Sequence, residues 1–437
     1  MTELSIVIPA LHEAANLRQL LPLLRATLDT EVPHSQILVV TSDQDLETSA
    51  VATGYGATVI RQSRLGYGGA LVAGFVAARG EFVLTMDADL SHPTGFIPTL
   101  WRQRHTAELI IASRYIPGGH ATMPAGRLLL SRSLNRVFSR GLGLPVRDMS
   151  SGFRLYRRRI LSPDAYASRH FDILQEILVR AYADGWRVRE VPFEHEPRGQ
   201  GSSHARIIAF GLAYCRTFWS LWKLRNSILC ADYDGRAHDS VIPLQRYWQR
   251  SRFHHLTELI KGRGRVLDVG CGSSRVIGAL PQGSVALDPL LHKLRYAKAY
   301  SCWLVQGSGF SLPFDDASFR CVLCSQVIEH VPKGSGILEE LNRVLAPGGR
   351  LVLGTPDYAN WQWRWMEKAY RFAVPGGYAD QHIAHYTRDE LIEKYRRWGY
   401  SLEESRYILR GELILAFAKP PAMARIEDRG PAARAPA

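Results

Sequence analysis

The sequence predicts two different α/β modules, joined by a basic and aromatic stretch. In both halves of the chain, strand-like runs rich in β-branched residues alternate with helical patterns. Alternation of this kind predicts mostly parallel sheets that helices cover on both faces. The length of 437 residues agrees, because domains average about 150 residues. The glycine and acidic patterns of the two halves differ, so the modules are not repeats of one unit.

The first module opens with a β-branched run, Leu4–Ile8, which Pro9 ends. A helix is expected after Glu13, because leucines recur at helical spacing from residue 17 to residue 24. The other strands of this module are expected at residues 36–40, 57–60, 82–86 and 109–112. The second module repeats the alternation, with strands expected at residues 265–269, 285–287, 321–324 and 350–353.

Four segments follow from this pattern. We expect a first domain at residues 1–205, a basic amphipathic connector at 206–240, a second domain at 241–419 and a disordered tail at 420–437. Basic residues interrupt the apolar run of the connector, so it is not expected to span a bilayer. Two placements remain open for it: packing on the first domain, or lying at a lipid headgroup boundary. The tail is rich in Pro and Ala, which is typical of disorder.

The composition narrows the class of protein. Lys and Arg total 54 against 41 Asp and Glu, and the net charge of +13 suits nucleic acid, phosphorylated ligands or an acidic membrane surface. No basic–aromatic recognition motif supports nucleic acid. Six cysteines make no disulfide framework in so long a chain, which favours a reducing cytosol. The N-terminus does not read as a signal peptide, and no uncharged apolar stretch is long enough to predict a membrane span.

The motif Met86-Asp-Ala-Asp-Leu-Ser-His-Pro93 directly follows a predicted strand. The carboxylates of Asp87 and Asp89 are two residues apart, where the chain leaves the sheet. Such a pair suits Mg²⁺ or Mn²⁺, ions that bridge the phosphates of a substrate. Upstream, the glycine-rich stretch 64–70 leads into a helix, where backbone N–H groups can face phosphate. Simple turn formation is the alternative reading of these glycines.

With these motifs, residues 4–204 resemble the family-2 glycosyltransferases, specifically the dolichol-phosphate mannosyltransferase group and its bacterial polyprenyl-phosphate relatives. The resemblance rests on ordered motifs, namely IVIPALHE, GYGGALVAGFVAARGEF, MDADLSHP, ASRYIPGG, SRSLNRVFSRGLGLPVRDMSSGFRLYRR and EVPFEHEPRGQGSS. It implies a GT-A fold, a nucleoside-diphosphate sugar donor and a polyprenyl or dolichyl phosphate acceptor.

The resemblance also assigns roles residue by residue. By this resemblance, Pro9 and Glu13 line the nucleotide pocket. Asp87 and Asp89, with Ser91, bind the metal ion. The residues that contact the acceptor phosphate are Arg114, Arg127 and Ser131, and Arg198 belongs to the loop over the donor. The basic run from residue 127 to 159 fits phosphate binding, except that Arg157, Arg158 and Arg159 are expected on a solvated helix face. A phosphate acceptor is already a nucleophilic anion, so no strong catalytic base is expected in this half.

Three positions depart from the family pattern. The residue before Glu13 is His12 where the family usually has Asn. After the second strand the family carries an acidic pair, whereas this chain has Thr41-Ser42 followed by Asp43, which we assign to the nucleotide. The family's Gly-x-Ser-Lys is Gly201-Ser-Ser-His204 here, without the fixed positive charge. The sugar and the base therefore stay open.

The second module contains a strand that runs into a glycine turn, Val266–Ser274. Gly270 and Gly272 let a ligand approach the backbone, Asp268 can orient the turn, and Asp288 ends the next strand where a ribose hydroxyl pair is expected. NAD binding is the competing interpretation. With the segments 312–314 (LPF), 327–331 (VIEHV) and 344–350 (VLAPGGR), the region 246–418 resembles the class I S-adenosylmethionine-dependent methyltransferases, in the small-molecule and glycan O-methyltransferase branch, with their Rossmann-like fold.

This second resemblance places Asp268, Gly270 and Gly272 at the methionine part of S-adenosylmethionine and Asp288 at its ribose. Ser308 stands where an acid often contacts the adenine amine, and Ser274 where a third glycine is frequent. The candidate bases are His330, His382 and His385, because a neutral imidazole is available near pH 7; for each, a packed structural histidine is the alternative. Cys321 and Cys324 are not expected to bind metal, since their spacing in a strand points them to opposite faces.

Together these patterns predict a bifunctional enzyme on the cytosolic face of a membrane. Its first half transfers a mannose-like sugar from a nucleoside diphosphate to polyprenyl or dolichyl phosphate, and its second half methylates a glycan or glycolipid. Two alternatives remain open. The acceptor is a soluble or growing cell-envelope glycan, or the methyltransferase half is degenerate and serves as a binding module.

Overall fold

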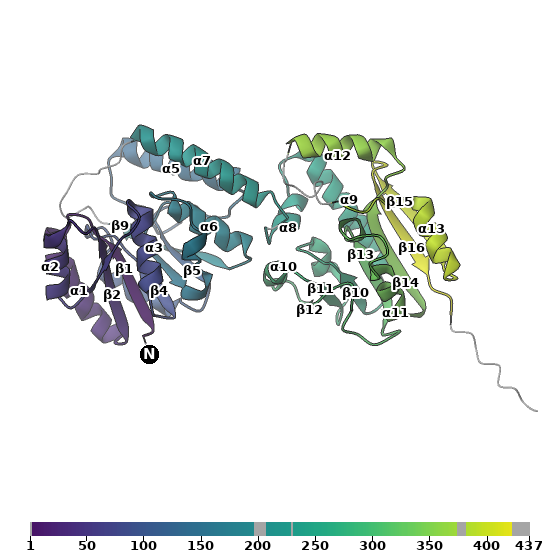
Figure 1. Cartoon of the computed structure of the whole chain (residues 1–437), viewed down its shortest axis with the longest axis horizontal. Helices are drawn as coiled ribbons and strands as arrows, with labels where there is room; N and C mark the ends of the chain where they lie inside the picture. Colours follow the sequence, from purple (N-terminus) through teal and green to yellow (C-terminus); the bar gives the residue numbers. More distant parts are fainter. Residues whose placement is uncertain (1, 196–206, 229, 374–381, 422–437) are drawn as a thin grey trace, which may run out of the picture. The chain divides into compact units, whose positions relative to one another are not determined.

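The computed structural model describes residues 2–195, 207–228, 230–373 and 382–421 (Figure 1). It divides into two compact units, Met1–Tyr233 and Asp234–Ala437. Each unit has its own seven-stranded sheet and its own apolar core. The predicted tail from residue 422 onward and residues 196–206, which include Arg198 and His204, lie outside the described residues.

The sheet of the first unit is mixed. In spatial order its strands are β3 (Thr58–Arg61), β2 (Ser35–Thr41), β1 (Leu4–Pro9), β4 (Phe82–Thr85), β7 (Arg154–Arg157), β5 (Leu109–Ser113) and β8 (Val188–Pro192). β7 runs antiparallel to both of its neighbours, whereas the other pairs are parallel. β6 (His120–Ala121) and β9 (Glu194–His195) form a separate two-stranded sheet. The five predicted strands of this half are confirmed as β1 to β5.

Helices pack on both faces of this sheet. They are α1 (Ala14–Glu31), α2 (Leu46–Gly54), α3 (Tyr67–Ala77), α4 (Ile97–Arg102), α5 (Ala125–Gly141), α6 (Ile173–Ala183) and α7 (Ile207–Arg225), with the short helices η1 (Thr94–Phe96), η2 (Arg158–Ile160) and η3 (Pro163–Ala165). Side chains alternate along each strand. In β1, Ile6 therefore faces the core that contains Leu17 of α1, and Val7 faces the core that contains Leu71 of α3.

One basic segment is structural. Arg154 lies on β7 and is fully buried, and its guanidinium donates to the carbonyls of Ser151, Leu174 and Met149. The expectation that the basic run up to residue 159 serves phosphate is therefore wrong for Arg154. A buried guanidinium needs hydrogen-bond acceptors, and here backbone carbonyls supply them.

The sheet of the second unit has the strand order β12 (Trp303–Gln306), β11 (Val285–Asp288), β10 (Val266–Val269), β13 (Phe319–Ser325), β14 (Leu345–Pro356), β16 (Glu412–Ala418) and β15 (Ser401–Ile408). The pairs from β12 to β14 are parallel, and those that involve β16 are antiparallel. All four strands predicted here are confirmed. Cys321 and Cys324 lie in the cores on opposite faces of the sheet, as their spacing predicts.

The helices of the second unit are α8 (Tyr233–His238), α9 (Pro243–Ile260), α10 (Leu291–Ala297), α11 (Ile337–Val344), α12 (Trp361–Ala373) and α13 (Arg388–Arg397), with the short helices η4 (Arg275–Ala279) and η5 (Ile328–His330). Leu256 and Ile260 of α9 pack on one face of the sheet, and Leu338 and Leu391 on the other. The carboxyl ends of β10, β11 and β13 share one edge, because these strands are parallel.

Helix α7 contains most of the basic, aromatic stretch. It packs against the first unit: Leu221 belongs to the core, Phe218 and Trp222 contact that core, and Thr217 donates to Asp172 at 2.7 Å. Trp219 remains 56% exposed. In the described parts of the chain, none of the helices combines the length and apolar character that a bilayer crossing requires.

Candidate active sites

The first site lies where β1, β2 and β4 end. Pro9 is the last residue of β1, and Glu13 follows it immediately before α1. The Glu13 carboxylate accepts a hydrogen bond from Asn16 at 2.6 Å, and its backbone N–H donates to Thr48. His12 has φ of 59°, a left-handed conformation in which Asn is common, so the backbone here favours the residue that His12 replaces.

The buried acid that follows β2 at this edge of the sheet is Asp45. It is buried, accepts the N–H groups of His12 and Thr48, and caps α2. Burial opposes its ionisation, yet these hydrogen bonds lower the pKa of Asp45 below its ordinary value. Asp43, which the sequence assigns to the nucleotide, is instead highly exposed and lies 3.8 Å from Arg61.

Asp87 and Asp89 directly follow β4, at the edge that also contains Pro9. Oδ1 of Asp89 accepts both the hydroxyl of Ser91, at 2.5 Å, and its N–H, at 3.2 Å. Leu90 between them has φ of 65°, so this turn has a conformation unusual for a branched residue. The three predicted ligands therefore lie in one tight turn, and they offer the hard oxygen atoms that Mg²⁺ and Mn²⁺ prefer.

His92 and Tyr67 hold Asp87. Nδ1 of His92 accepts the backbone N–H of Asp87 at 2.9 Å, and its Nε2 lies 3.9 Å from the Asp87 carboxylate. The His92 ring is buried and stacks on Phe153. The Tyr67 hydroxyl donates to Asp87 at 3.4 Å, and burial followed by the charge of Asp87 raises the pKa of Tyr67 well above its ordinary value. The position of His92 in the DADLSHP motif was the available signal for this role.

The glycines at the start of α3 serve packing. The N–H of Gly68 donates to the carbonyl of Arg169, and a Cβ on Gly66 or Gly68 would lie within 3.0 Å of the same carbonyl oxygen. The N–H of Ala70 bonds to Gly66 inside the helix. The interpretation that this stretch presents its N–H groups to phosphate is therefore wrong for these two groups, because neighbouring carbonyls already accept them.

Arg114 follows β5 and forms a two-pronged ion pair with Asp148, with Nε and Nη2 each 2.8 Å from a carboxylate oxygen. Nη2 also donates to Ser150 at 2.8 Å. Burial opposes the charge of Asp148, but Arg114 outweighs it, so the pKa of Asp148 lies below its ordinary value. The same carboxylate keeps Arg114 charged beside Asp87. Sequence reasoning missed Asp148, since its partner is 34 residues away.

We expect Asp148→Ala to lower the free energy of unfolding of the first unit by about 3–5 kcal/mol, because it leaves the Arg114 guanidinium without its buried counter-charge. Urea unfolding followed by circular dichroism measures this. An exposed carboxylate provides the matched control: Asp43→Ala should change the value by less than about 1 kcal/mol. Equal effects of the two substitutions would contradict the structural role of Asp148.

The hydroxyls of Ser131, on α5, and Tyr115 form a hydrogen bond of 2.7 Å. Arg114 and Arg132 both lie over the Tyr115 ring, at 5.1 and 5.7 Å from its centre. The structure thus brings Ser131 and Arg114 to the same aromatic residue. The side chain of Arg127 lies outside the described residues.

His195 of β9 completes this cluster. Burial, followed by the nearby charge of Arg114, lowers the pKa of His195 to about 4, although Asp87 and Asp89 oppose this shift. Its ring lies 6.3 Å from that of His92, and its buried Nδ1 has no partner among the described residues. The His195 ring is therefore neutral near pH 7. Sequence reasoning did not single it out, although it lies in the motif EVPFEHEP.

The second site is the glycine turn after β10. Gly270 and Gly272 have φ of 72° and 56°, conformations that favour glycine. A Cβ on Gly270 would lie 2.3 Å from Val327, and one on Gly272 would lie 3.0 Å from Asp234. Ser274, which replaces a third glycine, uses its hydroxyl to cap η4 by accepting the N–H of Val276.

Asp288 ends β11 and faces this turn. Its two carboxylate oxygens accept the N–H groups of Gly272 and Leu290, each at 2.8 Å. Each oxygen retains acceptor capacity, so the carboxylate suits a pair of ribose hydroxyls. Ser308 lies beyond β12, and its hydroxyl accepts the N–H of Phe310. These placements agree with a cradle for S-adenosylmethionine.

Asp234 supports the turn from outside the motif. It accepts hydrogen bonds from the N–H and hydroxyl of Ser273 and lies 3.2 Å from Lys293. Burial opposes its charge, but Lys293 and Ser273 lower the pKa of Asp234 to about 2. Nothing in the sequence near the glycines indicated this residue, since it lies 39 residues before Ser273.

Asp268 is buried in β10, and burial followed by the charge of Asp288 raises its pKa to about 7. An unfolded Asp has a pKa of about 3.9, so ionising Asp268 destabilises the folded unit as the pH rises toward 7. The substitution Asp268→Asn removes this effect. We expect the free energy of unfolding of Asp268→Asn, relative to the unchanged protein, to rise by about 2–3 kcal/mol between pH 5 and pH 8, measured by urea unfolding. A gain that does not change with pH would contradict the raised pKa.

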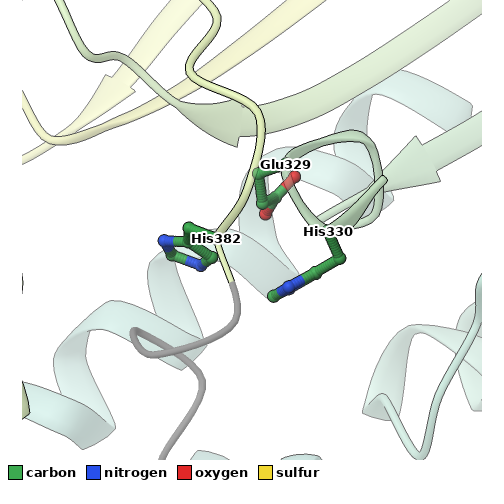
Figure 2. Close-up of side chains that lie close together, drawn as sticks. All are labelled: Glu329, His330 and His382. Atoms are coloured by element: carbon green, nitrogen blue, oxygen red, sulfur yellow. The ribbon is translucent and has the colours of Figure 1, made fainter. Parts of the chain in front are cut away.

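Two of the predicted residues, His330 and His382, lie around the end of β13 together with Glu329, which was not a predicted site residue. Glu329 and His330 belong to η5, and His382 lies beside them, with its ring centre 4.9 Å from that of His330 (Figure 2). Burial raises the pKa of Glu329 to about 8. His385 stacks on Tyr358, with ring centres 4.1 Å apart. The structure thus unites His330 and His382 and places His385 against Tyr358.

Comparison with known proteins identifies the family of each unit. Residues 5–163 match Glycosyl transferase family 2, and residues 267–353 match the family described as Methyltransferase domain. Dolichol-phosphate mannosyltransferase of Saccharomyces cerevisiae is 30% identical over 215 residues, which cover 46% of this chain and 80% of the yeast protein. Undecaprenyl-phosphate mannosyltransferase of Micrococcus luteus is 33% identical over 211 residues, which cover 45% of this chain and 85% of that protein. The chain belongs to glycosyl transferase family 2.

The family-2 domain is fused here to a second enzyme domain. Glycosyltransferase AglD of Haloferax volcanii is 30% identical over 233 residues, which cover 50% of this chain but only 37% of that relative's length. Among solved structures, glucosyl-3-phosphoglycerate synthase from Mycobacterium tuberculosis with Mn²⁺ and UDP is similar to 50% of this chain and 80% of its own, at 20% identity and a TM-score of 0.41. A SAM-dependent methyltransferase from Thermotoga maritima is similar to 40% of this chain and 93% of its own, at 21% identity and a TM-score of 0.34. By the two family matches, the first unit contains a glycosyltransferase domain and the second a methyltransferase domain.

Proposed function

We propose that the glycosyltransferase unit transfers a mannose-like sugar from a nucleoside diphosphate to polyprenyl or dolichyl phosphate. The observation that carries this is the single cluster at the edge of the sheet, where the Asp87–Asp89–Ser91 turn lies beside Arg114 and His195. The acidic turn suits a divalent cation on the donor diphosphate, and Arg114 suits the acceptor phosphate. The named activities of the yeast and Micrococcus relatives support this acceptor class.

In this proposal Asp87, Asp89 and Ser91 would hold Mg²⁺ or Mn²⁺, and the ion would supply positive charge opposite the leaving diphosphate. His92 and Tyr67 orient Asp87. Pro9 and Glu13 line the nucleotide pocket, and Arg198 belongs to the loop that covers the donor. Arg114, Arg127 and Ser131 position the acceptor phosphate, whose oxygen attacks the sugar carbon while the diphosphate leaves.

The surface of α5 favours a lipid acceptor. Leu129, Leu130, Leu134 and Val137 are between 46% and 69% exposed on this helix, which also contains Ser131 and Arg132. Exposed leucines interspersed with arginines are typical of helices at a headgroup boundary. We therefore propose that the enzyme works at the cytosolic face of a membrane, with α5 beside the bilayer and the cation site turned to the nucleotide sugar.

We further propose that the methyltransferase unit binds S-adenosylmethionine at Asp268, Gly270, Gly272, Asp288 and Ser308 and methylates a glycan or glycolipid. The bound donor would supply an electrophilic methyl group. Asp268 and Asp288 favour this cationic donor by charge, and His385 is the candidate that takes the acceptor proton. Fusion of the units raises the effective concentration of a shared intermediate.

A radiolabelled panel of sugar nucleotides, incubated with polyprenyl phosphate and Mn²⁺, tests the first activity. We expect label in the organic extract. Label found only on a water-soluble glycan would support the alternative acceptor. Calorimetry with S-adenosylmethionine tests the second unit, and absence of binding would indicate a degenerate methyltransferase that serves as a binding module.

A further inference from the structure

The methyltransferase unit contains a second group of ligand-type side chains, apart from the donor cradle. One carboxylate oxygen of Glu329 and one ring nitrogen each of His330 and His382 lie within 4.8 Å of one another. Glu329 and His330 follow β13, whereas His382 comes from a segment about fifty residues further along the chain. Figure 2 shows the carboxylate and the two rings directed toward a common space.

Glu329 supplies an independent observation. It is 0% exposed, and Oε2 accepts the Thr355 hydroxyl at 3.2 Å, while Oε1 is buried without a hydrogen-bond partner among the described residues. A buried carboxylate with an unmade interaction costs several kcal/mol unless a cation or donor completes it. The neighbouring cation, Arg252, makes its bonds to both oxygens of Glu412.

His382 is held by the residues around it. Its Nδ1 lies 3.0 Å from Oε1 of Glu367 and 2.9 Å from the Tyr358 hydroxyl, which also donates to Glu367. A carboxylate beside one ring nitrogen fixes the tautomer and orientation of the imidazole. This arrangement recurs behind histidines that bind metal ions.

The donor set identifies the class of ion. Two imidazoles and one carboxylate suit first-row divalent cations such as Zn²⁺, Mn²⁺ or Fe²⁺ better than Ca²⁺, which prefers oxygen ligands alone. Three protein ligands leave coordination positions for water or a substrate, as in catalytic rather than structural sites. We propose that Glu329, His330 and His382 form a divalent transition-metal site in the methyltransferase unit.

The segment that contains Glu329 lies next to the donor cradle in the fold. Val327, two residues before Glu329, is the residue that a Cβ on Gly270 would meet at 2.3 Å. Gln326 before it has φ of 60°, so the turn that delivers Glu329 leaves β13 in an unusual conformation. The position of the cluster therefore suits a role in holding the acceptor, and this role rests on the methyltransferase function proposed above.

A metal-bound acceptor hydroxyl loses its proton more readily than a free one. In the reaction, its oxygen forms the bond to the methyl carbon as the carbon–sulfur bond of S-adenosylmethionine breaks. The sulfur keeps that electron pair, S-adenosylhomocysteine leaves, and the hydroxyl proton passes to His385, the base proposed above. His330 and His382, considered as bases from the sequence, are thereby assigned to the ion instead.

Cobalt(II) binding tests the site directly, because His and carboxylate ligands give Co²⁺ visible absorption. The full chain is used with Asp89→Ala, which removes the cation site proposed in the glycosyltransferase unit. We expect one Co²⁺ per chain, with visible bands, and Zn²⁺ should compete for it. Adding His330→Gln or Glu329→Gln should weaken this binding by at least about tenfold. His254→Gln, which changes an exposed histidine of α9, should leave it unchanged.

The outcomes separate this proposal from the proposed function. Calorimetry with S-adenosylmethionine is run on each protein, and retained donor binding shows that the variant is folded. Two outcomes would overturn the metal site and leave the methyltransferase proposal standing. In the first, the protein binds S-adenosylmethionine but no Co²⁺. In the second, it binds both, and Co²⁺ binding is unchanged by His330→Gln and by Glu329→Gln. Co²⁺ binding at these residues without donor binding would retain the site and overturn the methyltransferase function.

Discussion

Asp89→Ala abolishes sugar transfer in our account, with a loss of about 10³-fold or more in kcat, and leaves methylation unchanged. The carboxylate lies in the turn with Ser91, and without it the cation that neutralises the leaving diphosphate loses a charged ligand. Initial rates with saturating Mn²⁺ and a radiolabelled sugar nucleotide measure the effect.

Asp89→Asn keeps the shape of the turn while removing the charge, and it should lose most of the activity as well. Asp29→Ala, which changes an exposed acid of α1, is the matched control and should transfer sugar normally. Activity of Asp89→Ala within about tenfold of the unchanged enzyme would contradict the assignment of the metal.

The second large effect is expected at Asp288. Its substitution by Ala removes the two hydrogen bonds proposed for the ribose, each worth about 1.5–3 kcal/mol to a charged group, so donor binding should weaken by about 10²–10⁴-fold. Calorimetry with S-adenosylmethionine measures this, and sugar transfer should not change.

Asp389→Ala is the control for that experiment, because Asp389 is an acid of α13 whose side chain is 91% exposed. It should bind the donor normally. Unchanged donor affinity in Asp288→Ala would remove the ribose assignment and would restore the possibility that the turn binds another ligand.

The sequence predicts the strands that lead into the motif turns, because each is encoded locally, but it does not predict the parallel strands β8 and β12. The signals for the predicted strands and turns lie within a few residues of the proposed ligand-binding positions. They are the apolar runs before Asp87 and Asp268 and the glycines at 270 and 272. The antiparallel strand β7 was missed because its sequence, RLYR, reads as a basic surface segment. Its burial depends on the carbonyls of Met149 and Ser151 just before the strand and of Leu174, twenty residues further along, and the residue pattern does not reveal these backbone contacts.

The same distinction applies to the sites. Asp87, Asp89 and Ser91 form a turn that their spacing already predicts, and Glu329 and His330 lie in a recognisable motif. Asp148 and Asp234 act on residues 34 and 39 positions away, so only the folded chain pairs them with Arg114 and Ser273. Asp43 stays exposed, whereas Asp45, two residues further along the chain, is buried by the fold.

Mass spectrometry of the products tests the central claim most directly. The full chain is incubated with polyprenyl phosphate, a panel of sugar nucleotides, S-adenosylmethionine and Mn²⁺, and the organic extract is analysed. Our account predicts a polyprenyl phosphate carrying one sugar, and a methylated glycan or glycolipid that forms only when S-adenosylmethionine is present. An extract without glycosylated lipid, while sugar nucleotide is consumed on a water-soluble acceptor, would contradict it.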